Sequence, residues 1–548
     1  MSSDLPVPRA ADVVARRLWE AGCRRAFGIP GGEVLTLVDA LEAAGIRFLL
    51  TKHENAAGFF GEGGHHRDGA PAVLVATIGP GVANAVNVVA NAWQDQVPML
   101  FLTGCVDSAT AATYTHQVFD HQALLRPVTK ASLRLEAGAA EPIVDRAVAT
   151  ALDGRPGPVH LDIPLGVAQT PEPPAAGGPY RRPRPAPAAP AASPDLDAAR
   201  RLLQAAERPL VLAGVDVLHH RADQALRRLA ETLGAPVVTT YKAKGVLPED
   251  HALSLGAAGL SPKADELLLP LFRKADAIVA AGYDPIEMRI GWRYPWAPGA
   301  PVVELAALAP THQMHAARHL FVGDVGAALA ALTPADGDVP ATSAHWLEGA
   351  VADVRRALDA AFAPEPVWGP GVVFDACREV LPRETVATAD SGAHRILLSQ
   401  VWRCPEPRTL LQSTALCTMG CAVPLAAGAR LADPSRPAVA FVGDAGLEMV
   451  LGELATIRDL GLPIIVVVLA DGSLALIEKK QRAQGLRNAG VDFPGTDFAA
   501  VAEALGGVGV RVRDRTTLVR ELEAALARTD RFTLLSCEIS RRTYDDRF

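Results

Sequence analysis

Short, wholly apolar segments alternate with amphipathic helical segments along the 548-residue chain, and this alternation limits its fold more than any other feature. The apolar runs 72–76, 277–281 and 437–442 contain no alternating polar residues, as expected of parallel strands covered on both faces. Helical patterns such as 10–22 and 141–152 lie between strands of this kind. The pattern predicts an α/β fold of three doubly wound parallel-sheet domains.

Segments rich in proline and alanine divide this alternation into three blocks. We predict an N-terminal domain over 1–169, a central domain over 195–335 and a C-terminal domain over 366–548. Residues 170–194 and 336–365 are predicted to be linkers.

Composition and charge exclude several classes of protein. With 49% hydrophobic residues and a net charge of −8, the chain is expected to be globular and to have neither nucleic acid nor an anionic membrane as its partner. Apolar runs such as 462–470 reach about half of the roughly 20 residues that a membrane span needs. The N-terminus also lacks the apolar core of a signal peptide. We therefore expect a soluble, cytoplasmic protein.

Acidic residues follow two predicted strands of the third block. The run 437–442 continues into GDAG (443–446), and the next buried run ends before DGS (471–473). The carboxyl ends of parallel strands meet at one edge of a sheet, where ligands bind. Two carboxylates there repel each other unless a cation lies between them, and Mg²⁺ prefers oxygen ligands together with a phosphate. The alternative is a Gly-Asp turn and a helix-capping Asp471.

The stretch from 443 to 478 resembles the thiamine-diphosphate motif of acetolactate synthases and their relatives. The resemblance implies that Mg²⁺ is bound by Asp444, by the Asp471 side chain and by the backbone carbonyl of Ser473. It also implies that the cofactor contacts the backbone at three small residues, Gly443, Ala445 and Gly446. The commonest family pattern has two adjacent asparagines at the position where this chain has Ala470-Asp471. Aspartate is an oxygen ligand too, so metal binding is still expected.

Segments of the first block resemble the same family in the same order, among them FGIPGGEVLTLVDAL (27–41), TKHENAAGFF (51–60) and the stretch 76–104. The resemblance implies that Gly31, Glu54 and Pro80 contact the cofactor. It also implies that Glu54 is catalytic: it hydrogen-bonds a pyrimidine nitrogen and favours the tautomer that removes the C2 proton of the thiazolium ring. In isolation, a glutamate at this position would be interpreted as a surface residue of a helix.

The stretch 410–429 resembles the family segment that supports the bent cofactor, and Met419 matches its apolar wedge. Without the surrounding match, a methionine would be interpreted as core filler. In this family the first domain of one chain faces the third domain of another. The resemblance therefore implies a homodimer or homotetramer with active sites at the interface.

Gln117 and Lys130 lie 13 positions apart, as do a glutamine and a lysine near the substrate in acetolactate synthases. A lysine there would hold a substrate carboxylate and a glutamine would orient a carbonyl; the alternative is a surface lysine. His116 precedes Gln117 in a THQ pattern similar to that of carboxyethylarginine synthase. The His116 side chain either exchanges a proton in the pocket or only supports its loop. The segment GYDPIE (282–287) resembles flavin-free members, so FAD is not expected.

These resemblances predict thiamine-diphosphate-dependent decarboxylation of a 2-oxo acid such as pyruvate, followed by carboligation to an acceptor carbonyl. Two other enzymes stay open: a carboxyethylarginine-synthase-like enzyme that converts a phosphorylated aldehyde, and a flavin-dependent oxidase. The alternative from another class is a non-catalytic subunit that binds the cofactor.

Overall fold

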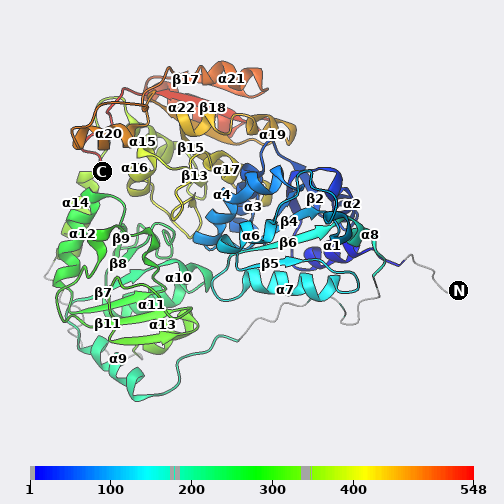
Figure 1. The fold of residues 1–548 in the computed structure, drawn as a ribbon. Coiled ribbons are helices and arrows are strands. Elements are labelled where there is room, and N and C mark those ends of the chain that lie inside the picture. Colours follow the sequence, from blue (N-terminus) through cyan, green and yellow to red (C-terminus); the bar gives the residue numbers. More distant parts are fainter. Residues whose placement is uncertain (1–6, 173–177, 179, 181–185, 335–345, 347–348) are drawn as a thin grey trace.

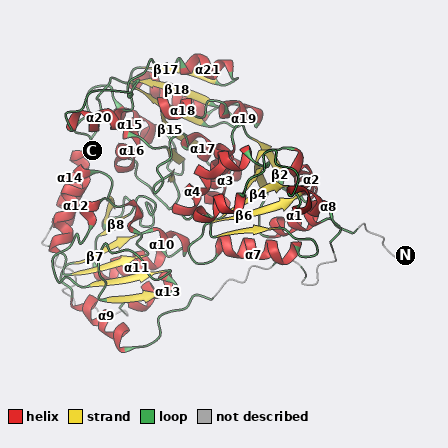
Figure 2. Cartoon of the chain, in the orientation of Figure 1, coloured by secondary structure: helices red, strands yellow, loops and turns green. Residues whose placement is uncertain are grey.

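Three six-stranded sheets, all of their strands parallel, organise the chain in the computed structural model (Figure 1). The structure describes residues 7–172, 178, 180, 186–334, 346 and 349–548. Figure 2 shows helices flanking the strands of each sheet, as in doubly wound α/β domains. The predicted fold class is confirmed.

The first sheet is built from the N-terminal part of the chain and has the strand order β2-β1-β3-β4-β6-β5. Its strands are β1 (Arg25–Ile29), β2 (Arg47–Leu50), β3 (Ala72–Ala76), β4 (Met99–Cys105), β5 (Ala131–Arg134) and β6 (Pro158–Pro164). Its helices are α1 (Ala10–Glu20), α2 (Leu35–Ala43), α3 (Glu54–Asp68), α4 (Pro80–Gln94), α5 (Ser108–Ala111), α6 (His121–Leu125), α7 (Ala140–Leu152) and α8 (Leu165–Gln169).

The central sheet has the strand order β12-β11-β10-β7-β8-β9. Its strands are β7 (Pro209–Ala213), β8 (Val237–Thr239), β9 (Ser254–Ala257), β10 (Ala277–Ala281), β11 (Val302–Ala306) and β12 (His319–Val322). Its helices are α9 (Pro194–Ala205), α10 (Val215–His219), α11 (Asp223–Leu233), α12 (Pro262–Lys274) and α13 (Val325–Leu332).

The third sheet has the order β14-β13-β15-β16-β18-β17, which repeats the connectivity of the first sheet. Its strands are β13 (Val386–Ala389), β14 (Leu410–Gln412), β15 (Ala438–Gly443), β16 (Ile465–Ala470), β17 (Val508–Val512) and β18 (Thr533–Glu538). The helices here are α14 (Ala350–Ala361), α15 (Pro370–Val380), α16 (Ala393–Val401), α17 (Ala422–Ala432), α18 (Asp444–Glu448), α19 (Glu453–Asp459), α20 (Ala475–Ala483), α21 (Phe498–Ala504) and α22 (Arg515–Leu526). Within the described ranges, no helix is both long enough and apolar enough to cross a membrane.

The second predicted linker, 336–365, is wrong in its C-terminal part, because α14 occupies 350–361. Val351, Val354 and Leu358 recur at helical spacing and pack against the hydrophobic core that the central and third sheets share. The rest of this linker, apart from Trp346, Gly349 and the residues after α14, lies outside the described residues, as does much of the segment 170–194.

Two glycines allow the first and third domains to pack closely through α3 and α17, which lie side by side in Figure 1. A Cβ added at Gly63 of α3 would lie 2.1 Å from the carbonyl oxygen of Leu425. A Cβ added at Gly428 of α17 would lie 2.0 Å from the carbonyl oxygen of Phe60. Each helix therefore approaches the other at a position where only glycine fits, and one apolar cluster spans both domains.

We predict that Gly63→Ala destabilises the protein by about 1–3 kcal/mol, the usual cost of overpacking a core. The matched control is Gly64→Ala, since a Cβ there would lie at an ordinary 3.7 Å from the carbonyl oxygen of Gly428. That variant should be neutral or slightly stabilising, because alanine is the better helix former. Thermal unfolding of both variants tests this prediction, and equal midpoints would contradict the close approach of the two helices.

Candidate active site

The residues predicted to hold a metal ion lie together at the carboxyl edge of the third sheet. β15 ends at Gly443, and its neighbour β16 ends one residue before Asp471. Oδ2 of Asp444 accepts hydrogen bonds from the backbone N–H groups of Asp471 (3.0 Å) and Gly472 (2.7 Å). Oδ1 accepts one from Ala445 (2.8 Å). These bonds fix the Asp444 carboxylate between the two strand ends.

Asp444 and Asp471 bring two like charges into a poorly solvated place, since Asp444 is only 3% exposed. Burial, and then the negative charge of Asp444, raise the pKa of Asp471 to about 7. Burial also raises the pKa of Asp444. A divalent cation between the carboxylates would remove their repulsion, and carboxylate oxygens are the ligands that Mg²⁺ prefers. The donor set therefore fits a magnesium ion.

Ser473 lies beside this pair and is held by two bonds. Its N–H donates to Oδ1 of Asp471 at 3.1 Å, and its hydroxyl donates to Oδ1 of Asp492 at 2.7 Å. Both bonds keep the 471–473 turn in place at the end of β16.

A pocket opens at this edge of the sheet. It is lined by residues 443–446, by Asp471 and Ser473, and by Met419 with the segment 474–477. A Cβ at Gly446 would lie 2.0 Å from a carboxylate oxygen of Asp390, so only glycine fits there. All of the third-domain residues predicted to bind the cofactor thus line one pocket.

His394 and Tyr544 also line the pocket, although no motif of the sequence pointed to them. A ring nitrogen of His394 (Nε2) lies 2.7 Å from Oδ1 of Asp390, while Oδ2 of Asp390 accepts a hydrogen bond from the N–H of Gly420. Asp390 had a usable signal, because it directly follows the buried strand β13, at the same sheet edge as Asp444. Tyr544 lies far along the chain from every motif and had none.

Gly31, Glu54 and Pro80 lie together at the carboxyl edge of the first sheet. They follow β1, β2 and β3, and Glu54 and Pro80 are the first residues of α3 and α4. Glu54 is 5% exposed, and its Oε2 accepts a hydrogen bond from the side-chain amide of Asn84 at 3.1 Å. A Cβ at Gly31 would lie 2.1 Å from the hydroxyl of Thr77. Glu54 is the first residue of a helix, as the alternative interpretation of a surface helix residue predicts. Its side chain, however, is buried and does not lie at the surface.

Gln117 lies at this edge as well, and His116 precedes it. A Cβ at Gly79 would lie 2.7 Å from the carbonyl oxygen of Gln117, so the two loops touch. The side chains of His116 and Gln117 are exposed in the single chain, and the His116 ring contacts Tyr114 edge-on. Both residues are therefore accessible to a substrate or to a second chain.

Lys130 does not lie with these residues, which corrects its predicted place beside Gln117. It precedes β5, at the amino edge of the first sheet and opposite the edge that carries Glu54. Its ammonium group donates to the backbone carbonyls of Asp153 (2.5 Å) and Arg155 (2.9 Å). Sequence spacing alone does not tell on which edge of a sheet a residue lies.

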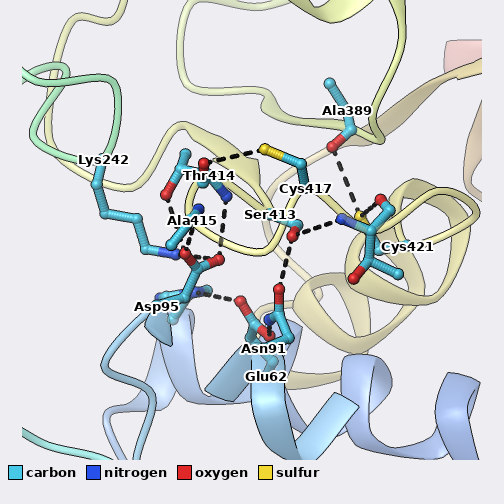
Figure 3. Close-up of polar contacts among 12 residues, drawn as sticks. Glu62, Asn91, Asp95, Lys242, Ala389, Ser413, Thr414, Ala415, Cys417 and Cys421 are labelled. Carbon is cyan, nitrogen blue, oxygen red and sulfur yellow. Dashed lines mark hydrogen bonds and ion pairs between the residues drawn. The ribbon is translucent and has the colours of Figure 1, made fainter. Parts of the chain in front are cut away.

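Figure 3 shows a buried polar joint where residues of all three domains meet. The carboxylate of Asp95, just after α4, accepts hydrogen bonds from the N–H (3.1 Å) and hydroxyl (3.0 Å) of Thr414 and from the N–H of Ala415 (2.8 Å). It also pairs with the ammonium group of Lys242 in the central domain at 3.0 Å. Because residues 413–415 lead to Met419, this joint fixes the segment that carries the predicted wedge.

The pocket and Glu54 belong to different halves of the molecule. Among the described residues that line the pocket, none comes from the first domain. The pocket of a single chain therefore does not contain the glutamate of the same chain.

Models of one enzyme family match all three domains of the chain. The N-terminal and C-terminal thiamine pyrophosphate-binding domain models match residues 8–124 and 390–537, and the central domain model of the same enzymes matches 196–332. Glu54 lies in the range matched by the N-terminal model, and Asp444 and Asp471 lie in the range matched by the C-terminal model.

Relatives align along almost the whole chain. The "Acetolactate synthase" of Mycobacterium bovis is 32% identical over 544 residues, which are 95% of this chain and 86% of that protein. The "Acetolactate synthase isozyme 1 large subunit" of Escherichia coli is 32% identical over 514 residues, 90% of this chain and 88% of that protein. The "Probable acetolactate synthase large subunit" of Methanocaldococcus jannaschii is 29% identical over 553 residues, 96% and 91% of the two chains. The chain belongs to the thiamine pyrophosphate enzyme family and carries its N-terminal, central and C-terminal domains in order.

Proposed function

We propose that this enzyme decarboxylates a pyruvate-like 2-oxo acid and joins the remaining fragment to an acceptor carbonyl, as an acetolactate synthase does. The observation that carries the proposal is the pocket at the edge of the third sheet, where the buried carboxylate of Asp444 and the half-buried carboxylate of Asp471 meet small residues and Met419. The relatives named acetolactate synthase, which align with all three domains, support the reaction class.

Thiamine diphosphate, when bound, supplies a nucleophilic carbon and accepts the electrons that carbon dioxide leaves behind. We assign Asp444, Asp471 and the carbonyl of Ser473 to a Mg²⁺ ion, and the backbone at 443–446 to the diphosphate. Met419 is assigned to the support of the bent cofactor. The cleft fits such a group because two carboxylates, the oxygen donors that Mg²⁺ prefers, line it together with the small residues at 443, 445 and 446.

Glu54 is assigned the role of exchanging a proton with the pyrimidine ring of the cofactor. Its burial keeps water from competing for this hydrogen bond, and Asn84 fixes the carboxyl group through Oε2. Gln117 is assigned to the orientation of a substrate carbonyl and His116 to proton exchange. Lys130 is not proposed as a catalytic residue, because it lies at the opposite edge of the sheet.

We infer that two chains combine to make each site, as a homodimer or a homotetramer. The pocket of one chain lacks first-domain residues in its described lining, while Gln117 and His116 are exposed at the edge that carries Glu54. A second chain that supplies this edge would complete the pocket. From the Gly282–Glu287 segment we also infer that the enzyme works without FAD, and the visible absorption spectrum of the purified protein tests this inference.

We predict that Glu54→Gln lowers carboligase activity by about 10²- to 10⁴-fold, the usual contribution of a general acid–base group. The affinity for thiamine diphosphate should change only a few-fold, because the diphosphate contacts lie in the other domain. Acetolactate formed from pyruvate, together with calorimetric titration of the cofactor, measures both effects. The control is Glu42→Gln on α2, whose side chain accepts a bond from the N–H of Phe48 far from the pocket. A Glu54→Gln enzyme as active as wild type would contradict the assigned role.

A second prediction concerns pH and the metal ion. Below about pH 7 the carboxyl of Asp471 carries a proton, which Mg²⁺ must displace. The apparent Mg²⁺ affinity should therefore fall roughly tenfold per pH unit below that value and level off above it. Asp471→Asn should bind Mg²⁺ weakly and lose this pH dependence. A slope that is unchanged in the variant would show that another group competes with the metal ion.

The same shift predicts how the stability of the metal-free protein varies with pH. The folded pKa of Asp471 lies above the unfolded value, so the folded state binds more protons between the two values. Stability contributed by this group is present at low pH and is lost as pH rises through about 7. Thermal unfolding in a chelator should show that Asp471→Asn gains on wild type as pH rises from 5 to 8. In a separate series with Mg²⁺ in place of the chelator, the ion should stabilise wild type more than the variant. An equal midpoint difference at both pH values would contradict the raised pKa.

A further inference from the structure

The central domain buries an acidic side chain in the middle of an apolar strand. Glu304 is 3% exposed and lies in β11, where its strand neighbours Val303 and Leu305 are fully buried. A carboxylate in such a place is costly unless its oxygens are hydrogen-bonded or bound to a cation. Glu304 lies in a different domain from the active-site pocket and has no part in the reaction proposed above.

Two histidines of the loop between β11 and β12 face this carboxylate. Nε2 of His315 lies 3.1 Å from Oε2 of Glu304, and Nε2 of His312 lies 3.8 Å from Oε1. The three potential ligand atoms all lie within 4.8 Å of one another. Two imidazoles three positions apart in this loop thus lie beside one carboxylate.

Two of these buried atoms have no hydrogen-bond partner in the described structure. They are Oε1 of Glu304 and Nε2 of His312, which face each other across 3.8 Å. That separation is too long for a hydrogen bond. Leaving a buried polar atom unpaired costs about 1–3 kcal/mol. A ligand bound between these two atoms would remove that cost.

We propose that Glu304, His312 and His315 bind a zinc ion. Bonds of about 2.0–2.2 Å to imidazole nitrogen and carboxylate oxygen would place the ligand atoms roughly 3.4 Å apart around a tetrahedral ion. The two separations above, 3.1 and 3.8 Å, lie on either side of that value. Imidazole and carboxylate together suit zinc better than magnesium or calcium, which prefer oxygen. Three protein ligands leave the fourth position for a water molecule.

Aromatic rings hold both imidazoles in place. The His315 ring contacts Trp296 edge-on at a centroid distance of 5.1 Å and lies 5.7 Å from the Tyr283 ring, which also contacts His312 at 6.2 Å. Such packing limits the rotation of both rings. The ion would tie the 307–318 loop to β11.

A second histidine–carboxylate cluster, formed by His121, His160 and Asp162, shows the contrast. There the hydroxyl of Thr103 lies 2.7 Å from Oδ1 of Asp162 and 2.8 Å from Nε2 of His160. The remaining nitrogen of His160 pairs with the hydroxyl of Ser132 at 2.7 Å. This cluster is satisfied by hydrogen bonds and leaves no orphaned ligand atom for a metal ion.

The test uses the full-length untagged protein, stripped with a chelator and then loaded with zinc sulfate in excess Mg²⁺. We expect one zinc ion per chain by elemental analysis, and an affinity that falls by about 100-fold or more in His312→Ala. Glu304→Gln, which keeps the size of the side chain, should lose zinc as well. His312 is partly exposed, so its replacement is expected to leave the fold intact, which circular dichroism checks.

Matched controls separate this site from the other candidates for zinc. His251→Ala removes a histidine that bonds Glu231 at the surface, and His121→Asn alters the second cluster. Asp471→Asn alters the proposed magnesium site. All three should keep one zinc ion per chain with wild-type affinity. Zinc should also raise the thermal midpoint of wild type but not of His312→Ala.

Two results would overturn the proposal: a wild-type protein that retains no zinc, or a His312→Ala variant that binds zinc as tightly as wild type. Neither result bears on the carboligase activity, because this experiment contains no thiamine diphosphate and no 2-oxo acid.

Discussion

The pair of carboxylates at the ends of β15 and β16 is the constraint on which the account depends. Asp444 is held by three backbone N–H groups and cannot turn away from Asp471, so the two charges stay close wherever the strands stay paired. Two carboxylates this close stay together when a proton or a cation compensates their charge, and the surrounding small residues leave room for a phosphate group. Placing a coenzyme tail at this sheet edge explains the carboxylates and the glycines together.

The rest of the molecule positions this edge. Close packing between α3 and α17 joins the first domain to the third, and Asp95 binds the segment that leads to Met419 while it pairs with Lys242 of the central domain. The first and third sheets share one connectivity, so each presents its carboxyl edge in the same way. The enzyme thus consists of two similar halves that contribute different chemistry: a metal-binding edge and an edge that carries a buried glutamate.

The features that could be predicted from the sequence are those that a local run of residues determines. Interior strands such as β3, β10 and β15 are uninterrupted apolar runs and were recognised at their observed positions. Edge strands such as β5 and β12 are half-exposed and carry polar residues, so no apolar run revealed them. Asp444 and Asp471 were identifiable because each directly follows a recognisable strand. His394 and Tyr544 reach the pocket through contacts with segments far along the chain, and the Glu304 cluster depends on how the loop after β11 folds back onto its own strand. Lys130 was misplaced because spacing does not specify a sheet edge.

The central claim is that Asp471 of one chain and Glu54 of another serve the same site. Mixing inactive Glu54→Gln and Asp471→Asn chains under conditions that exchange subunits tests it directly. If two chains build each site, hybrid dimers contain one intact site, and the mixture should recover about a quarter of wild-type activity at random assortment. If each chain served its own site, every site in the mixture would keep one defect, and the absence of recovered activity would contradict the account.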